Sequence, residues 1–282
     1  MEHPFALKMD SHTELYGIIG NPVKHSLSPA LHNAAFSAVG LNAVYIAFEA
    51  EDIKGCIEGI RGLGIKGMSV TIPFKESVIP FLGAIDPLAR RIGAVNTIVN
   101  RGGGLTGYNT DAIGALMALE AETPLSGKSC ILLGAGGAAR AIGFILKQKG
   151  ASLSIVNRSL VRGQRLARSL ECRFLPLEEL AAVRGEILIQ TTPVGMSPHL
   201  DQCPVPEVVL RQGMVVMDII YDPLETRLLR MARERGCTAI NGIPMLIHQG
   251  AEQFRLWTGV DPPLSAMRKA IEEALSKRHE AH

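Results

Sequence analysis

The sequence predicts an α/β protein, and three observations carry this prediction. The chain has 282 residues, of which 47% are hydrophobic, which is enough for one large domain or two modest ones. Short apolar, β-branched runs alternate with longer amphipathic segments along almost the whole chain, which is typical of α/β folds with largely parallel sheets. A glycine-rich segment near Gly134 follows one of these runs and indicates that a second domain begins there.

Eight apolar runs are predicted strands, with helical patterns between most of them. In chain order they are Leu15–Ile19, Ala43–Phe48, Lys66–Thr71, Ala94–Val99, Cys130–Leu133, Leu153–Val156, Glu186–Gln190 and Val215–Ile219. The tripeptide Gly102–Gly104 is predicted to turn the chain between two short strands. Met245 to Ala274 is helical throughout in its pattern, and its two helices have no sheet of their own. They must therefore pack on a domain that is already formed, and the first domain is one candidate.

Composition excludes several functional classes. The formal net charge is +2 with acidic and basic residues interspersed, so we expect no nucleic-acid or membrane partner. Met1 to Thr13 lacks a signal-peptide pattern, and no apolar stretch approaches the about 18 residues of a membrane span. Five scattered cysteines form no C-x-x-C, which favours reduced thiols in the cytoplasm. Eight histidines show no ligand spacing, so we expect no metal site.

The glycine-rich motif is Gly134-Ala135-Gly136-Gly137-Ala138-Ala139, between a predicted strand and the helical pattern Ala138–Lys149. It matches G-x-G-x-x-A, in which the glycines allow a tight turn and close approach to a pyrophosphate, and the small last residue lets the helix pack near the strand. The helix N-terminus then binds the phosphates. The alternative is a glycine-rich turn without a ligand. A second match, Gly62-x-Gly64-x-x-Gly67, follows a helix and precedes a strand. This order is the reverse of the required one, so it predicts only a helix end and a turn.

The residues after the next predicted strand indicate the cofactor. An acidic side chain there would bind the ribose of NAD, but the chain has Asn157-Arg158-Ser159, with Arg162 one turn on. Two guanidinium groups and short polar donors fit a 2′-phosphate, which predicts NADP. The alternative is two solvated arginines at a helix start.

Two serines precede the first predicted helix. Ser26 and Ser28 lie at its N-terminus, where two hydroxyls can bind a carboxylate. For Ser28 alone, which precedes Pro29, a helix N-cap is the better interpretation, whereas Ser26 has no such duty.

Three further polar residues lie near strand ends or in the loops that follow, where α/β proteins form ligand sites. Lys75 follows a strand and, on spacing alone, is a surface lysine. Asn96 lies in an otherwise apolar strand, where its side chain needs a partner. Asp111 could simply begin a helix.

Nine motifs resemble, in order, those of the shikimate dehydrogenase family. They are G-N-P-V-K-H-S-L-S-P, S-V-T-I-P-F-K, A-V-N-T-I, G-Y-N-T-D, G-A-G-G-A-A-R, N-R-S, T-T-P-V-G-M, D-I-I-Y-D-P-L-E-T and G-I-P-M-L-I-H-Q-G-A-E-Q-F. The resemblance runs from about Tyr16 to Trp257 and shows no departure at the positions that the family uses. Each motif alone is modest, but nine in order are very specific.

The resemblance implies the residues of the site. The carboxylate-binding serines fall on Ser26 and Ser28, and the catalytic lysine falls on Lys75 with Asp111 as its partner. Other substrate contacts fall on Thr71, Asn96, Asp111, Tyr221 and Gln249. The NADP contacts fall on Gly134, Ala135, Gly136, Gly137 and Ala138, on Asn157, Arg158, Ser159 and Arg162 for the 2′-phosphate, and on Ile219 and Gly242 beside the nicotinamide.

The resemblance also implies the domain plan and the activity. We expect a substrate-binding and catalytic domain at 1–111, a Rossmann-type NADP domain at 112–244, and C-terminal helices at 245–282 that pack on the substrate domain. The active site would lie in the cleft between the domains. The implied reaction is the reversible NADPH-dependent reduction of 3-dehydroshikimate to shikimate, in chorismate and aromatic amino-acid biosynthesis. We expect no partner beyond this small molecule and a monomer or homodimer.

Lysine suits the implied proton transfer. Its pKa lies far above neutrality, so Lys75 starts as a donor, and an ammonium group stabilises a developing negative oxygen. Two alternatives remain. A quinate/shikimate dehydrogenase that uses NAD(P) is disfavoured because no acid lies near Arg158. A non-catalytic NADP-binding sensor would not need Lys75 and Asp111 together with the serines.

Overall fold

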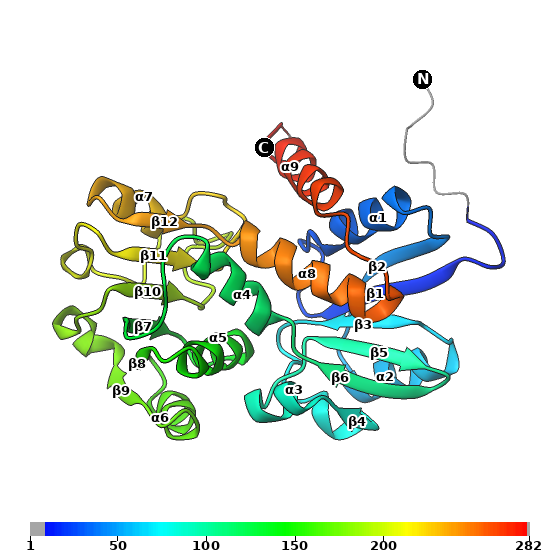
Figure 1. The fold of residues 1–282 in the computed structure, drawn as a ribbon, viewed down its shortest axis with the longest axis horizontal. Helices are drawn as coiled ribbons and strands as arrows, with labels where there is room; N and C mark the ends of the chain where they lie inside the picture. Colours follow the sequence, from blue (N-terminus) through cyan, green and yellow to red (C-terminus); the bar gives the residue numbers. More distant parts are fainter. Residues whose placement is uncertain (1–8, 281–282) are drawn as a thin grey trace. The chain divides into compact units, whose positions relative to one another are not determined.

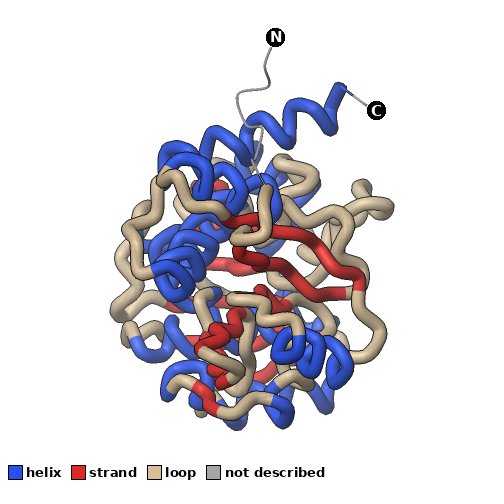
Figure 2. Tube along the Cα trace, turned by 90° about the vertical axis from the view of Figure 1, so that its right-hand side faces the viewer, coloured by secondary structure: helices blue, strands red, loops and turns tan. Residues whose placement is uncertain are grey.

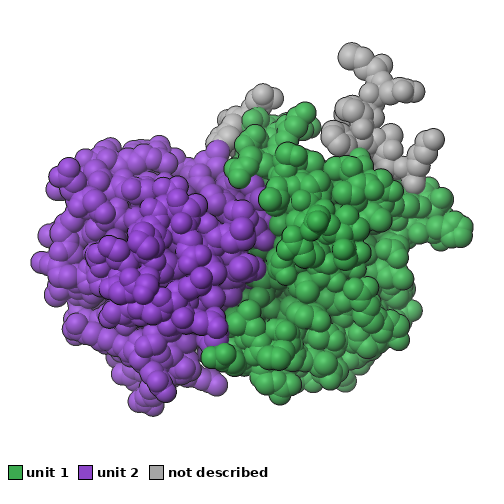
Figure 3. All heavy atoms as spheres, viewed as in Figure 1, with its two compact units in different colours: residues 1–110, 249–282 green, residues 111–248 purple. Residues whose placement is uncertain are grey.

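The computed structural model describes residues 9–280 and divides the chain into two compact units (Figures 1 and 3). Unit 1 consists of residues 1–110 and 249–282, and unit 2 of residues 111–248. We expected Asp111 in the first domain and residues 245–248 in the C-terminal segment, but both belong to unit 2. Residues 1–8, most of the segment expected to carry no signal peptide, lie outside the described residues.

Unit 1 contains a mixed six-stranded sheet with the order β2-β1-β3-β5-β6-β4. Its strands are β1 (Glu14–Gly20), β2 (Ala43–Glu49), β3 (Gly67–Val70), β4 (Ala84–Ile85), β5 (Thr97–Arg101) and β6 (Gly104–Tyr108). β1 pairs in parallel with β2 and β3, whereas β3, β5 and β6 pair antiparallel. The expectation of a largely parallel sheet is therefore only partly met here. Gly102 and Gly103, both at positive φ (59° and 89°), form the predicted tight turn, and such a turn can only join antiparallel strands.

The helices of unit 1 come from both ends of the chain. They are α1 (Ser28–Ala38), α2 (Ile53–Gly62), α3 (Pro87–Ile92), the short η1 (Ile79–Phe81), the second half of α8 (Ile243–Thr258) and α9 (Leu264–Glu280). α9 packs on α1, and Trp257 Nε1 of α8 donates to Ile98 O of β5 over 2.9 Å. The expected return of the C-terminal helices to the first domain is thus confirmed. Gly259, at φ 72°, separates the two helices.

The second glycine motif, Gly62-x-Gly64-x-x-Gly67, lies in unit 1 and has a structural role. α2 ends at Gly62, and Gly64 turns the chain at φ 66°, as predicted. Gly67 has no room for a Cβ because the Trp257 indole lies against it. The spacing G-x-G-x-x-G therefore marks a helix end and a close packing contact.

Unit 2 is a doubly wound parallel sheet with the order β12-β11-β10-β7-β8-β9 (Figure 1). Figure 2 distinguishes the helices (blue) from the strands (red) of the chain. Its strands are β7 (Ser129–Leu133), β8 (Ser152–Asn157), β9 (Arg173–Pro176), β10 (Ile187–Gln190), β11 (Val215–Asp218) and β12 (Thr238–Ile240). Its helices are α4 (Asp111–Glu120), α5 (Gly137–Gln148), α6 (Leu160–Ser169), α7 (Arg227–Glu234), the short η2 (Leu177–Ala182) and η3 (Glu207–Val209), and the start of α8. The strand order reverses between β7 and β10, and Rossmann folds bind dinucleotides at this switch point.

Candidate active site

The loops that follow β1 and β3 lie side by side at one edge of the unit 1 sheet, because these strands are parallel neighbours. The Asn21 amide donates to Ile72 O over 2.9 Å, and Gly20 has no room for a Cβ because the Thr71 methyl lies against it. The loop with Ser26 and Ser28 therefore adjoins the loop with Thr71 and Lys75.

The two serines differ from the prediction in their local roles. Ser28 is the first residue of α1 and 5% exposed, but the N-cap is Leu27, whose side chain makes no capping hydrogen bond. The Ser26 hydroxyl instead accepts the Ser28 amide proton over 3.2 Å. The N-cap prediction for Ser28 is thus wrong, because the helix begins one residue earlier than Pro29 suggested. Ser26, for which we expected no structural role, accepts a hydrogen bond from the first residue of the helix. Both hydroxyls remain at the N-terminus of α1.

Lys75 lies half-buried in the turn between β3 and η1. Its carbonyl accepts the Val95 amide proton over 2.8 Å, so the segment before β5 packs beside it. That segment carries Asn96, which places two predicted site residues at the same edge of unit 1.

Asn96 lies just before β5 rather than inside a strand, and it is 2% exposed. Its Oδ1 accepts the Thr110 amide and the Thr97 hydroxyl, both over 2.8 Å. Its Nδ2 donates to Thr110 Oγ1 over 2.9 Å and to Gln249 Oε1 over 3.4 Å. The expectation that this side chain needs a partner is confirmed, and Asn96 meets Gln249 although they are far apart in the sequence.

A buried polar network that sequence reasoning missed continues from this pair. Gln253 Nε2 donates to Thr97 Oγ1 (2.9 Å) and to Asn96 O (3.2 Å). Its Oε1 accepts the Ser69 hydroxyl (2.9 Å) and lies 3.3 Å from His32 Nε2. Burial lowers the pKa of His32 to about 3, so this imidazole is neutral at pH 7. The sequence held one signal for this network: Gln253 follows Gln249 by one helical turn and therefore lies on the same face of α8.

The glycine loop of unit 2 has the geometry that a pyrophosphate requires. Gly134 adopts φ 114°, and Thr191 leaves no room for a Cβ on it. α5 begins after Gly136 without a side-chain cap among residues 9–280, and Ala139 is fully buried against the sheet. The first-turn N–H groups of α5 are therefore available to phosphate oxygens, so this loop fits a dinucleotide.

The loop after β8 carries Arg158, and the first turn of α6 carries Arg162. Asn157 Nδ2 donates to Ser159 O over 2.8 Å, and the Ser159 hydroxyl caps α6 by accepting the Arg162 amide. The side chains of Arg158 and Arg162 are exposed, and no described acidic residue pairs with either. Two such guanidinium groups fit a 2′-phosphate.

The remaining predicted residues lie at other points of unit 2. The Ile219 amide donates to Gln190 O (3.1 Å) and the Gly242 amide to Ile220 O (2.9 Å). A Cβ on Gly242 would collide with the Ile219 carbonyl, so these two predicted residues are in contact. Tyr221 is half-buried in the same loop, and Asp111 is buried as the first residue of α4.

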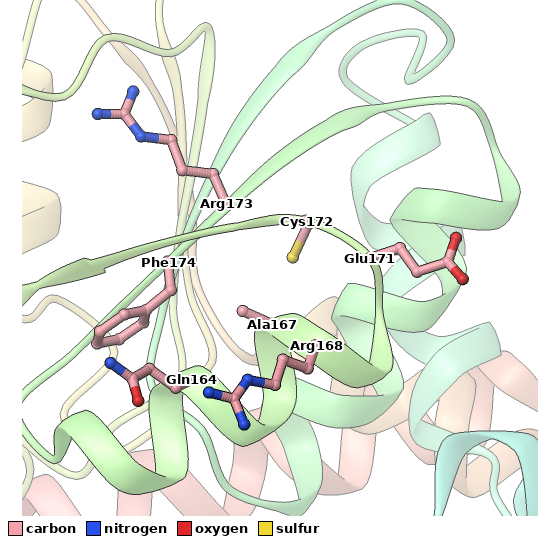
Figure 4. Close-up of a pocket in the computed structure, with 7 residues that line it drawn as sticks. All are labelled: Gln164, Ala167, Arg168, Glu171, Cys172, Arg173 and Phe174. Carbon is pink, nitrogen blue, oxygen red and sulfur yellow. The ribbon is translucent and has the colours of Figure 1, made fainter.

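A surface hollow of unit 2 contains none of the predicted residues (Figure 4). It is lined by Gln164, Ala167, Arg168, Glu171, Cys172, Arg173 and Phe174. Burial raises the pKa of the Cys172 thiol to about 11, so it stays protonated and poorly nucleophilic at neutral pH. Within the described part of the chain, no cluster of three acidic, histidine or cysteine side chains could hold a metal, and no helix is long and apolar enough to cross a membrane.

A Rossmann unit with arginines after its second strand, combined with a unit that has a buried polar set at a sheet edge, defines a class of protein. It is a dinucleotide-dependent oxidoreductase with a separate substrate-binding unit. Residues 18–98 match the shikimate dehydrogenase substrate binding domain, 116–220 the shikimate / quinate 5-dehydrogenase family, and 242–272 the shikimate 5'-dehydrogenase C-terminal domain. The chain belongs to the shikimate dehydrogenase family.

Individual relatives agree with this assignment. Shikimate dehydrogenase (NADP(+)) of Pyrococcus furiosus is 47% identical over 277 residues, which cover 96% of this chain and 99% of that protein. The crystal structure of shikimate 5-dehydrogenase from Thermus thermophilus, in complex with NADP(H) and shikimate, has a TM-score of 0.86 at 38% identity and covers 93% of this chain and 100% of that one. Quinate dehydrogenase from Corynebacterium glutamicum, in complex with NAD, has a TM-score of 0.86 at 31% identity and covers 93% and 99%. The predicted family and its class, an NADP-dependent oxidoreductase, are confirmed.

Proposed function

We propose that this chain catalyses the reversible, NADPH-dependent reduction of 3-dehydroshikimate to shikimate, a step of aromatic amino-acid biosynthesis. The observation that carries the proposal is the buried Asn96–Gln249 pair, which lies at the sheet edge that also carries Lys75. The relatives named as NADP-dependent shikimate dehydrogenases support the substrate and the cofactor.

The substrate carboxylate would bind Ser26 and Ser28 at the N-terminus of α1, where the helix dipole favours an anion. The ring hydroxyls and the carbonyl would contact Thr71, Asn96, Asp111, Tyr221 and Gln249. Asn96 is suited to this role because Thr97 and Thr110 already fix its amide plane. Little rotational freedom is then lost on binding, which favours a reactive orientation of the ring.

NADPH, when bound, supplies the hydride to C3 of the substrate. The Gly134–Ala138 loop and the N-terminus of α5 would hold its pyrophosphate, and Asn157, Arg158, Ser159 and Arg162 would hold its 2′-phosphate. Ile219 and Gly242 would lie beside the nicotinamide. Lys75 would donate a proton to the carbonyl oxygen as it becomes an alkoxide and take it back in shikimate oxidation, with Asp111 orienting the ammonium.

Initial rates of the purified chain with two substrates and two cofactors test this function. Absorbance at the NADPH band should rise when shikimate and NADP+ are supplied together. Quinate in place of shikimate, or NAD+ in place of NADP+, should give much lower kcat/KM. A preference for quinate or NAD+ would favour a quinate/shikimate dehydrogenase. NADPH binding without turnover of either substrate would favour the sensor.

We also propose that the enzyme acts in the cytoplasm as a monomer or a homodimer. All five cysteines are free thiols in the structure, as is typical of proteins from a reducing compartment. Light scattering of the purified chain measures its oligomeric state.

A further inference from the structure

The loop between β11 and α7 carries two of the proposed contacts, Ile219 and Tyr221, and one buried pair joins its two ends. Asp218, the last residue of β11, is 0% exposed, and Thr226, the N-cap of α7, is 1% exposed. The Thr226 hydroxyl donates to Asp218 Oδ2 over 2.8 Å. We refer to this pair as the clasp.

Each residue of the clasp also accepts a hydrogen bond from a backbone amide. Asp218 Oδ1 accepts the Ile220 amide proton over 3.1 Å, inside the loop. Thr226 Oγ1 accepts the Leu229 amide proton over 3.3 Å, in the first turn of α7. The carboxylate therefore fixes the start of the loop with one oxygen and its end with the other.

A carboxylate is a costly group to place here. No lysine or arginine pairs with Asp218 among the described residues, and burial raises its pKa to about 6. A charge in such a place destabilises the fold unless its hydrogen bonds are complete. Stability alone would be served by a neutral side chain, so the two-oxygen acceptor points to a geometric role.

Two backbone hydrogen bonds to neighbouring segments also hold the first half of the loop. The Ile219 amide is bonded to Gln190 O, and the Ile220 carbonyl to the Gly242 amide. Asp218 supplies the third attachment at Ile220, one residue before Tyr221. The direction in which the chain leaves Ile220 is therefore set by the clasp.

We propose that Asp218 and Thr226 are positioning residues that hold Ile219 and Tyr221 for hydride transfer, an inference that rests on the proposed function. Neither contacts the ligands in this account; both act through the backbone of the loop. The phosphate-binding groups follow β7 and β8 and are attached independently of the clasp. Loss of the clasp should therefore impair turnover and substrate binding while NADPH affinity is retained.

Three variants test the inference in the full-length enzyme. Thr226→Val keeps the side-chain shape and removes the hydroxyl, and Asp218→Asn keeps the shape and removes one acceptor. Thr226→Ser retains the hydroxyl and removes only the methyl group. Glu225→Gln is the matched control, because the exposed Glu225 forms ion pairs with Arg230 and Arg233 on the surface of α7. For each, kcat, the KM for 3-dehydroshikimate and NADPH affinity are measured. The kinetic isotope effect with NADPH deuterated at the transferred hydride is measured as well.

Thr226→Val and Asp218→Asn should lower kcat by roughly 10- to 100-fold, the usual consequence of a small misplacement of reacting groups. Their isotope effect should rise, because hydride transfer becomes more fully rate-limiting, and their KM should rise while NADPH affinity hardly changes. Thr226→Ser and Glu225→Gln should resemble the unaltered enzyme in all four measurements.

Two results would overturn the inference alone. One is an unchanged kcat in both Thr226→Val and Asp218→Asn. The other is a fall in kcat that follows the folded fraction with an unaltered isotope effect, since partial unfolding removes active molecules without changing the chemistry of the rest. An unaltered chain that does not turn over 3-dehydroshikimate with NADPH would overturn the proposed function and this inference with it.

Discussion

The two units build their binding groups in different ways. In unit 1, Asn96, Gln249 and Gln253 are buried side chains that hold one another through hydrogen bonds. In unit 2, the groups proposed to bind the cofactor are the backbone of a glycine loop, an uncapped helix N-terminus and two exposed arginines. A polar ring with several hydroxyls needs fixed donors and acceptors in many directions, whereas phosphates need only N–H groups and positive charge. Substrate recognition should therefore depend on packing around the site, and cofactor recognition on local motifs.

The largest effect should come from Lys75, because it acts in the transition state. Lys75→Ala should lower kcat by about 10²–10⁴-fold, the usual contribution of general acid–base catalysis. NADPH affinity should hardly change, since the groups proposed to bind the cofactor lie in unit 2. Lys75→Arg should not rescue shikimate oxidation, because a guanidinium group stays protonated and cannot accept the proton. Lys54→Ala, which changes an exposed lysine, is the control and should leave kcat unchanged. A near-normal kcat of Lys75→Ala in both directions would contradict the assignment.

Arg158→Ala should separate the two cofactors. Loss of a charge-assisted contact should weaken NADPH binding by about 1.5–3 kcal/mol and leave NADH binding nearly unchanged. Titration of both cofactors measures this, and Arg165→Ala, on the exposed face of the following helix α6, should have little effect. Equal weakening of NADPH and NADH would show that Arg158 does not contact the 2′-phosphate.

The difference between packed side chains in unit 1 and local motifs in unit 2 also decides how well each site could be predicted from the sequence. The glycine motif and Asn157–Arg162 are contiguous in the sequence, so their positions at strand ends and helix starts could be predicted. The structure has them at the junctions of β7 with α5 and of β8 with α6. Ser69, Thr97 and Gln253 were missed because each is an ordinary polar residue until the sheet of unit 1 brings them together. Short strands such as β4, β9 and β12 were missed as well, because two to four residues show no clear alternation.

Gln253→Leu should test the packing dependence of unit 1. Ser69, Thr97 and Asn96 would lose buried partners, which should destabilise the fold by about 1–3 kcal/mol. The KM for shikimate should rise because Asn96 is held less firmly, and NADPH affinity should not change. Denaturant unfolding and steady-state kinetics measure both effects. Glu252→Gln, a less buried neighbour on the same helix, should change neither by much. An unchanged KM in a destabilised Gln253→Leu would limit this network to a structural role.

Acid should act on the units in opposite directions. His32 in unit 1 has its pKa lowered to about 3 by burial, so the unfolded chain binds a proton that the folded chain does not, and stability falls as pH drops below about 6.5. Asp218 in unit 2 has its pKa raised to about 6 by burial, so the folded chain binds the extra proton and gains stability between about pH 6 and 4.

Asp218→Asn should remove the second contribution and leave the first. The free energy of unfolding should then fall more steeply than in the unaltered chain, by about 1.4 kcal/mol per pH unit in that window. Denaturant titrations at several pH values measure the two slopes. Parallel curves would mean that the Asp218 carboxyl group titrates at its ordinary value in the folded protein.

The division of labour between the units is tested most directly by combining Ser26→Ala and Arg158→Ala in one chain. Ser26→Ala should mainly raise the KM for shikimate, because a carboxylate contact is similar in the ground and transition states. Arg158→Ala should weaken NADPH. In the double variant the two losses in kcat/KM should add to within about 0.5 kcal/mol, as for independent sites. A coupling energy well above that value, or a loss of NADPH affinity in Ser26→Ala alone, would contradict the account.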